Sequence, residues 1–182
     1  MGIILESGSS IEKVKTRVDE KLLSPKAPGK VHLSIPGQAY LLTAATMFRR
    51  PVFRNVEAAR IVSSTHEMKW VWRDSQWLAW VLTPTHWHCL VVLGKDDELK
   101  NLIGRFKRAS SEKVDERFKI NGWLWAKGFR DRSLNREVVL RDAAMHLVAI
   151  PVRAGLVEDV GKYPYWNAAW LDSENLHAGS FF

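Results

Sequence analysis

The chain has 182 residues, of which 46% are hydrophobic and 26% are charged, a composition typical of one soluble globular domain. Its net charge of +7 favours a polyanionic partner, nucleic acid before membrane. No apolar run reaches the roughly 20 residues of a membrane helix, and the segment MGIILESGSS lacks the basic flank and long apolar stretch of a signal peptide. With a single cysteine, Cys89, which excludes an internal disulfide, we expect a cytoplasmic protein.

The first half of the chain predicts one helix and three strands. Residues 1–36 contain the breaker cluster SPKAPGK and are interpreted as an N-terminal extension or arm. The segment AYLLTAATMF predicts a strand, and Asn55 is a candidate cap for a helix that begins at Val56. QWLAWVLTP and HWHCLVVLG then predict two strands joined by a tight turn at Pro84.

The second half predicts a helix, a strand and a helix. DDELKNLIGRFKRASSEKVDERF is a basic amphipathic helix, GWLWAKGFRDR is a fourth strand, and NREVVLRDAAMHLVAI is a helix stopped by Pro151. This order predicts an α+β fold with a ferredoxin-like split βαβ core, an antiparallel sheet with helices on one face, and a C-terminal helix that carries position 146. The domain would span 37–172, followed by a tail at 173–182.

Two histidines mark the third predicted strand. His86 and His88 are two positions apart, so their side chains share one face while Trp87 points to the other. Two imidazoles on a rigid strand make half of a divalent-metal site. Hydrogen-bonded histidines on a polar face would give the same spacing, so both interpretations stay open. Cys89 lies in the apolar run CLVVL and is expected to be buried.

Five segments, in order, resemble the REP-associated tyrosine transposases of the HUH single-strand transposase superfamily. They are YLLTAATMFRRPVF, WVLTPTHWHCLVVLG, ELKNLIGRFKRAS, WAKGFRDRSL and IPVRAGLVEDVGKYPYW. The resemblance implies a bacterial cytoplasmic protein of DNA transposition and recombination that binds single-stranded or hairpin DNA. It also implies Mg²⁺ or Mn²⁺ at His86 and His88, strand cleavage and joining by a tyrosine of the C-terminal helix, and, as in some superfamily members, a homodimer.

The sequence departs from the family pattern on that helix. The position of the family's tyrosine is His146, and the position of a metal-binding amide is Ile150. Residues four apart share a helix face, so the face expected to meet the metal lacks both groups. His146 could be an inert replacement, a third ligand that would suit Zn²⁺ or Mn²⁺, or a nucleophile. Tyr40 lies in the first predicted strand, and Tyr163 and Tyr165 are expected to give aromatic packing of the C-terminal segment. A tyrosine supplied by another chain stays open as an alternative.

Basic side chains from two segments are expected to contact DNA phosphates beside the histidines, although a solvated charged face would show the same pattern. They are Arg105, Lys107 and Arg108 of the first long helix, and Lys127, Arg130 and Arg132 of the fourth strand and its loop. The sequence therefore favours a transposase-like protein with metal-dependent cleavage. The alternatives are a catalytically inactive DNA-hairpin-binding module and a nuclease that uses activated water.

Overall fold

The computed structural model describes residues 33–121, 123–134 and 137–169. Within them, five strands form one antiparallel sheet in the order β4-β1-β3-β2-β5. The strands are β1 (Ala39–Ala45), β2 (Gln76–Leu82), β3 (His86–Val92), β4 (Arg130–Leu134) and β5 (Trp166–Ala168). The order of the first four confirms the split βαβ core and the α+β class. The short strand β5, which the sequence analysis did not anticipate, extends the sheet beside β2.

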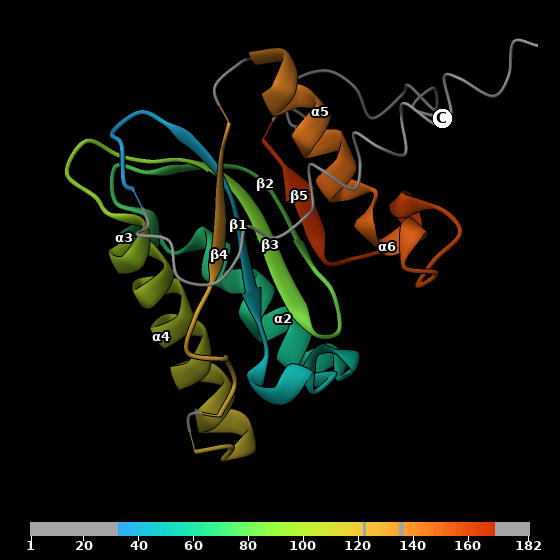
Figure 1. Ribbon diagram of the computed structural model, residues 1–182. Helices are drawn as coiled ribbons and strands as arrows, with labels where there is room; N and C mark the ends of the chain where they lie inside the picture. Colours follow the sequence, from blue (N-terminus) through green and yellow to red (C-terminus); the bar gives the residue numbers. More distant parts are fainter. Residues whose placement is uncertain (1–32, 122, 135–136, 170–182) are drawn as a thin grey trace, which may run out of the picture.

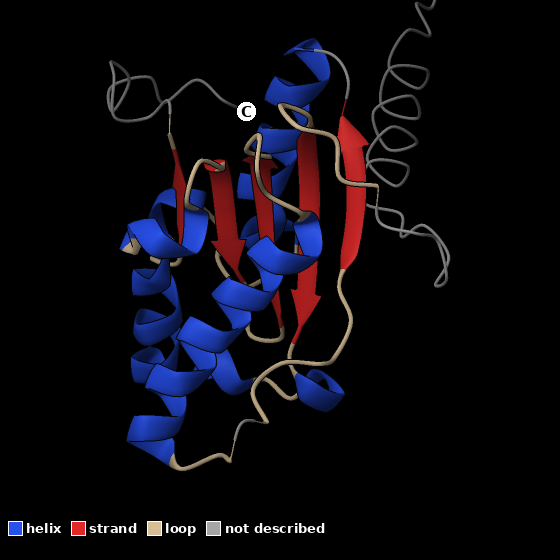
Figure 2. Ribbon diagram, turned by 90° about the vertical axis from the view of Figure 1, so that its left-hand side faces the viewer, coloured by secondary structure: helices blue, strands red, loops and turns tan. Residues whose placement is uncertain are grey.

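Helices cover both faces of the sheet (Figure 1). They are α2 (Val56–Ser64), α3 (Lys69–Trp72), α4 (Leu99–Phe118), α5 (Glu137–Val148) and α6 (Ile150–Arg153). We call the face packed against α2, α3 and α4 the tryptophan face, because it carries Trp80 and Trp87. The other face, which α5 covers, is the histidine face, because alternation along β3 places His86 and His88 there with Leu90. In Figure 2 the strands run side by side behind helices.

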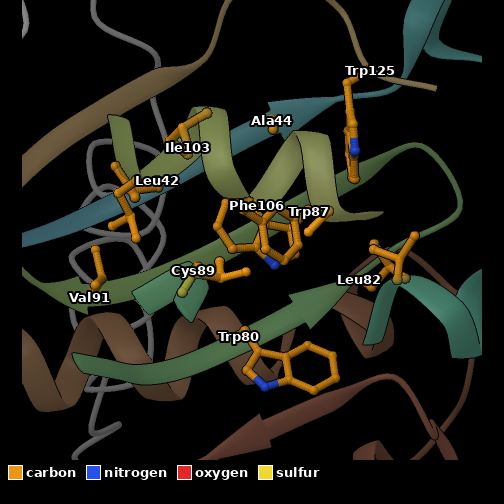
Figure 3. Close-up of a cluster of buried hydrophobic side chains, with 14 of the residues drawn as sticks. Leu42, Ala44, Trp80, Leu82, Trp87, Cys89, Val91, Ile103, Phe106 and Trp125 are labelled. Carbon is orange, nitrogen blue, oxygen red and sulfur yellow. The ribbon is translucent and has the colours of Figure 1, made fainter. Parts of the chain in front are cut away.

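Aromatic side chains form the centre of the tryptophan face (Figure 3). The fully buried ring of Trp87 stacks on Phe106 of α4 with centroids 4.0 Å apart. Its indole N–H donates to Nε2 of His66 at 2.9 Å, and Nδ1 of His66 lies 2.9 Å from the carbonyl of Ser63. His66 also stacks on Trp80 at 3.9 Å. His66 is therefore a buried structural residue, neutral and protonated on Nδ1.

Two helix starts show how side chains set the boundaries. The side chain of Asn55 accepts from the backbone N–H of Ala58 at 3.0 Å, which confirms it as the cap of α2. The first N–H of α4, from Leu99, donates to Oγ of Ser34 at 3.0 Å, so this cap comes from a distant part of the chain. The hydroxyl of Tyr40 holds the same segment, because it donates to the carbonyl of Leu33 and accepts from the N–H of Ile35.

Two boundaries predicted in the second half of the chain were wrong. The fourth strand begins only at Arg130, because Trp125 is buried in the core and donates its indole N–H to Ser110, leaving an isolated bridge to Thr46. Pro151 does not stop a helix: α5 already ends at Val148, and Pro151 lies in the first turn of α6, where a missing N–H costs nothing.

The predicted N-terminal arm and C-terminal tail lie almost entirely outside the described residues. Only positions 33–36 of the arm are described, and they are attached to the domain by the bonds of Ser34 and Tyr40. None of the helices in the described ranges is both long enough and apolar enough to cross a membrane.

His66 should make folding stability depend on pH. Burial lowers its pKa from 6.5 to about 3, so unfolding releases a ring that takes up a proton between these values, and stability falls as the pH drops through this window. In His66→Phe, stability at about pH 7 should fall by about 2 kcal/mol, because the Trp87 N–H loses its acceptor. Urea unfolding across the window should show a shallower loss on acidification than in the native chain, and an unchanged slope would contradict this account.

Candidate functional site

His86 and His88 lie side by side at the start of β3, as the spacing predicted. Their ring centroids are 5.8 Å apart and the ring planes differ by 22°. Nδ1 of His86 lies 2.7 Å from the hydroxyl of Thr85, and Nδ1 of His88 lies 3.0 Å from the hydroxyl of Thr43. No residue in the described ranges hydrogen-bonds to Nε2 of either ring. A threonine hydroxyl can accept from Nδ1 or donate to it, and in the tautomer with the proton on Nδ1 each Nε2 carries a lone pair.

Both rings are neutral at neutral pH. Burial lowers the pKa of His88 to about 3, and the neighbouring ring of His86 adds to this effect. Burial also lowers the pKa of His86, and the positive charges of Arg49 and Arg130 lower it further. Neutral imidazole is the form that binds metal ions, so neither ring has to lose a proton first.

The register of the sheet brings two of the predicted basic residues to the histidine face. Thr43 of β1 pairs with His88 on one side and with Arg130 on the other, so the three side chains form a row across β4, β1 and β3. Arg132 occupies the next row on the same face, opposite Leu41. Lys127 is exposed in the loop that leads into β4.

The basic residues of α4 lie elsewhere, and the prediction that they adjoin the histidines was wrong. Helix α4 packs on the tryptophan face through Phe106 and its neighbours. Arg105 forms an ion pair with Asp97 and donates to the carbonyl of Val71 at 2.8 Å. Lys107 donates to two backbone carbonyls, both at 2.7 Å, and burial lowers its pKa to about 8. Arg108 is exposed.

The carbonyls bound by Lys107 belong to Ala126 and Gly128, so this cation holds the loop before β4. Arg105 is likewise engaged with buried acceptors. Of the three predicted phosphate contacts on α4, only Arg108 therefore presents its charge to solvent; its guanidinium lies 5.8 Å from the ring centroid of Trp70.

His146 lies near the end of α5, the helix that covers the histidine face. Its Nδ1 lies 2.7 Å from the carbonyl of Asp142 one turn earlier, so Nδ1 carries the proton. Ile150 begins α6 and packs against the apolar cluster of this face. Across the described ranges, no three His, Cys, Asp or Glu side chains are gathered in a way that could hold a metal ion. The structure thus does not join His146 to His86 and His88 in a three-ligand group.

A comparison with models of protein families identifies the chain. Residues 35–140, more than half of it, match the model described as transposase IS200 like. The chain belongs to the IS200-like transposase family. The matched region of this transposase-family protein includes every strand from β1 to β4 and the histidine pair.

A solved structure supports the same fold. A REP-associated tyrosine transposase bound to a REP hairpin has a TM-score of 0.62 and 19% identity, over 77% of this chain and 82% of that one. A protein described as a transposase from Deinococcus radiodurans R1 has a TM-score of 0.46 and 18% identity, over 64% of this chain and 91% of that one. A comparison with curated protein sequences gave no match.

No tyrosine of this transposase-family chain takes the place of the missing one. The chain has three tyrosines, and the hydroxyl of Tyr40 is used in the anchor to Leu33. Tyr163 donates to the carbonyl of Leu82 at 2.6 Å, and burial raises its pKa to about 12. Tyr165 packs against the tryptophan-face cluster. The prediction that Tyr163 and Tyr165 serve aromatic packing is confirmed, because their rings lie edge to face with centroids 5.7 Å apart.

Arg49 is a site residue that the sequence analysis missed. It lies in the turn after β1, η1 (Met47–Arg49), and its charge acts on His86. The apolar pattern predicts a first strand that runs through Phe48, whereas β1 ends at Ala45 and the chain then turns. The pair of arginines in FRRP was the available signal, because adjacent charges after an apolar strand indicate an exposed turn.

Arg105 should prove to be a residue of the fold. Its side chain is 13% exposed and the side chain of its partner Asp97 is 1% exposed. In Arg105→Ala that carboxylate stays buried without its cation, which should lower the free energy of unfolding by about 3 kcal/mol. Arg108→Ala, a change of the same type on an exposed part of α4, should stay within about 0.5 kcal/mol. Chemical denaturation measures the free energy of unfolding of both variants. Equal losses of stability would contradict a structural role for Arg105.

Proposed function

We propose that this chain binds hairpin or single-stranded DNA through the histidine face and does so without forming a tyrosine–DNA bond. The observation that carries the proposal is the row of Arg130, Thr43 and His88, with Arg49 acting on His86 from the end of β1. Family membership supports it, as does the likeness in fold to a transposase that was solved with a REP hairpin.

We further propose that His86 and His88 hold a divalent cation, Mg²⁺ or Mn²⁺. The donor set fits in part: two neutral imidazoles side by side, each oriented by a threonine hydroxyl, supply two ligands. The remaining positions would be filled by water and by a phosphate oxygen of the DNA. A bound cation supplies Lewis acidity, which withdraws charge from that phosphate. Arg130 and Arg132 would hold the adjoining phosphates.

The second candidate function is metal-dependent cleavage with activated water, which would leave no protein adduct. The observation that favours it is the neutral histidine pair, since both of its members lie on β3 and neither depends on a side chain of α5. In this account His146 is not a nucleophile. Helix α5 packs against the histidine face through apolar side chains, and Nδ1 of His146 donates to the carbonyl of Asp142 within the same helix.

The orienting role of Thr43 leads to a test of the metal site. Thr43→Val keeps the shape of the side chain but removes the hydroxyl that holds Nδ1 of His88. It should weaken Mn²⁺ binding about 10-fold or more. Isothermal titration calorimetry measures this, with Thr43→Ser as the control that keeps the hydroxyl and the affinity, and with His88→Ala as the variant that loses binding. Unchanged affinity in both Thr43→Val and His88→Ala would rule out the site.

Binding and cleavage are separated by one end-labelled hairpin. The native chain should shift the hairpin in a salt-dependent way, and Arg130→Ala should lower the slope of log affinity against log salt by about one. On a denaturing gel with Mn²⁺, we expect no protein–DNA adduct from the native chain and an adduct from the double variant His146→Tyr with Ile150→Asn. A native adduct would contradict the proposal, and cut DNA without an adduct would establish the second candidate.

A further inference from the structure

Two large aromatic rings lie exposed beside the histidine end of the sheet. The side chains of Phe48 and Trp123 are 69% and 57% exposed, and their ring centroids are 6.3 Å apart at an angle of 32°. The guanidinium of Arg50 lies 5.7 Å from the centroid of the Phe48 ring. Rings of this size are usually buried, so an exposed pair beside cations is a feature that packing alone does not explain.

The backbone holds Phe48 outward in an unfavourable conformation. Phe48 has φ 55° and ψ 21°, and Arg49 has φ 52°, so two successive residues with Cβ atoms occupy the left-handed region. Such strain persists only where the surroundings fix it. Here the hydroxyl of Thr46 donates to the carbonyl of Arg50 at 2.7 Å, and the N–H of Met47 donates to the carbonyl of Leu124 at 2.9 Å.

Further backbone bonds of Thr46 connect both rings to the histidine strand. The N–H of Thr46 donates to the carbonyl of Thr85 at 2.9 Å, and the hydroxyl of Thr85 contacts His86. The bridge between Thr46 and Trp125 fixes the loop that carries Trp123. The two rings, the turn after β1 and His86 therefore belong to one hydrogen-bonded unit.

We propose that Phe48 and Trp123 form a stacking platform for unpaired bases of single-stranded DNA, with Arg49 and Arg50 contacting the phosphates that join them. Exposed aromatic faces accept any base, and arginines beside them add charge and cation–π attraction, which is how proteins hold unpaired nucleotides. This inference rests on the proposed DNA binding and adds to it: the platform takes the strand outside the duplex, next to the phosphates at the histidine face.

The test compares two labelled hairpins of the same stem, one blunt and one with a short unpaired extension, by fluorescence anisotropy with the full chain. The native chain should bind the extended hairpin more tightly. Phe48→Ala and Trp123→Ala should each weaken that binding about 10-fold, with binding of the blunt hairpin unchanged. Phe48→Asn removes the ring but tolerates a positive φ, so it should bind as weakly as Phe48→Ala while its melting temperature stays equal or rises.

Trp70→Ala is the matched control, because Trp70 is 47% exposed and lies beside an arginine, Arg108, on the α4 side of the molecule. It should bind both hairpins like the native chain. Equal losses in Trp70→Ala, equal affinity of the native chain for both hairpins, or a matching loss on the blunt hairpin would each overturn the platform and leave the proposed function intact. If the native chain binds neither hairpin, both fall.

Discussion

The hydrogen bond from Trp87 to His66 fixes the register on which the rest of the structure depends. β3 is the middle strand of five, and Trp87 lies on it between His86 and His88. Because side chains alternate along a strand, a slip of one residue would send Trp87 to the histidine face and both histidines into the core. The stacking on Phe106 and the acceptor nitrogen of His66 exist in one register only. Core packing thus sets the position of a polar site that it does not touch.

The elements that the sequence predicted well are those whose signal is local. The spacing of His86 and His88, the cap at Asn55 and the turn at Pro84 depend on neighbouring residues alone. The errors came from residues whose role is set far along the chain. Trp125 makes its segment look like a strand, but its indole is buried in the core and donates to Ser110. The strand itself starts five residues later, at Arg130. The start of α4 depends in the same way on a partner 65 positions earlier.

The candidate site was half predictable for the same reason. Alternation places Arg130 and Arg132 on the histidine face once the strand is known. The periodicity of α4 shows which basic side chains lie outside the apolar stripe of the helix. It does not show which hydrogen-bond acceptors those side chains contact. Arg105 is paired with a buried carboxylate and Lys107 with loop carbonyls. The residues next to them in the sequence do not distinguish these two cations from Arg108. The left-handed turn at Phe48 was equally hidden, because no glycine marks it.

The cap that Ser34 provides for α4 attaches a residue of the predicted N-terminal arm to the folded domain. Ser34 precedes the turn at Pro36 and Gly37 that leads into β1, yet its hydroxyl accepts the first N–H of a helix that begins 65 positions later in the chain. A tension applied at Leu33 and Ser34 would therefore reach both Tyr40 of β1 and Leu99 of α4 before it passed the turn at Pro36 and Gly37. From Leu99 it would pass along α4 to Phe106 and the ring of Trp87, so Ser34 is mechanically coupled to the strand that carries the histidines.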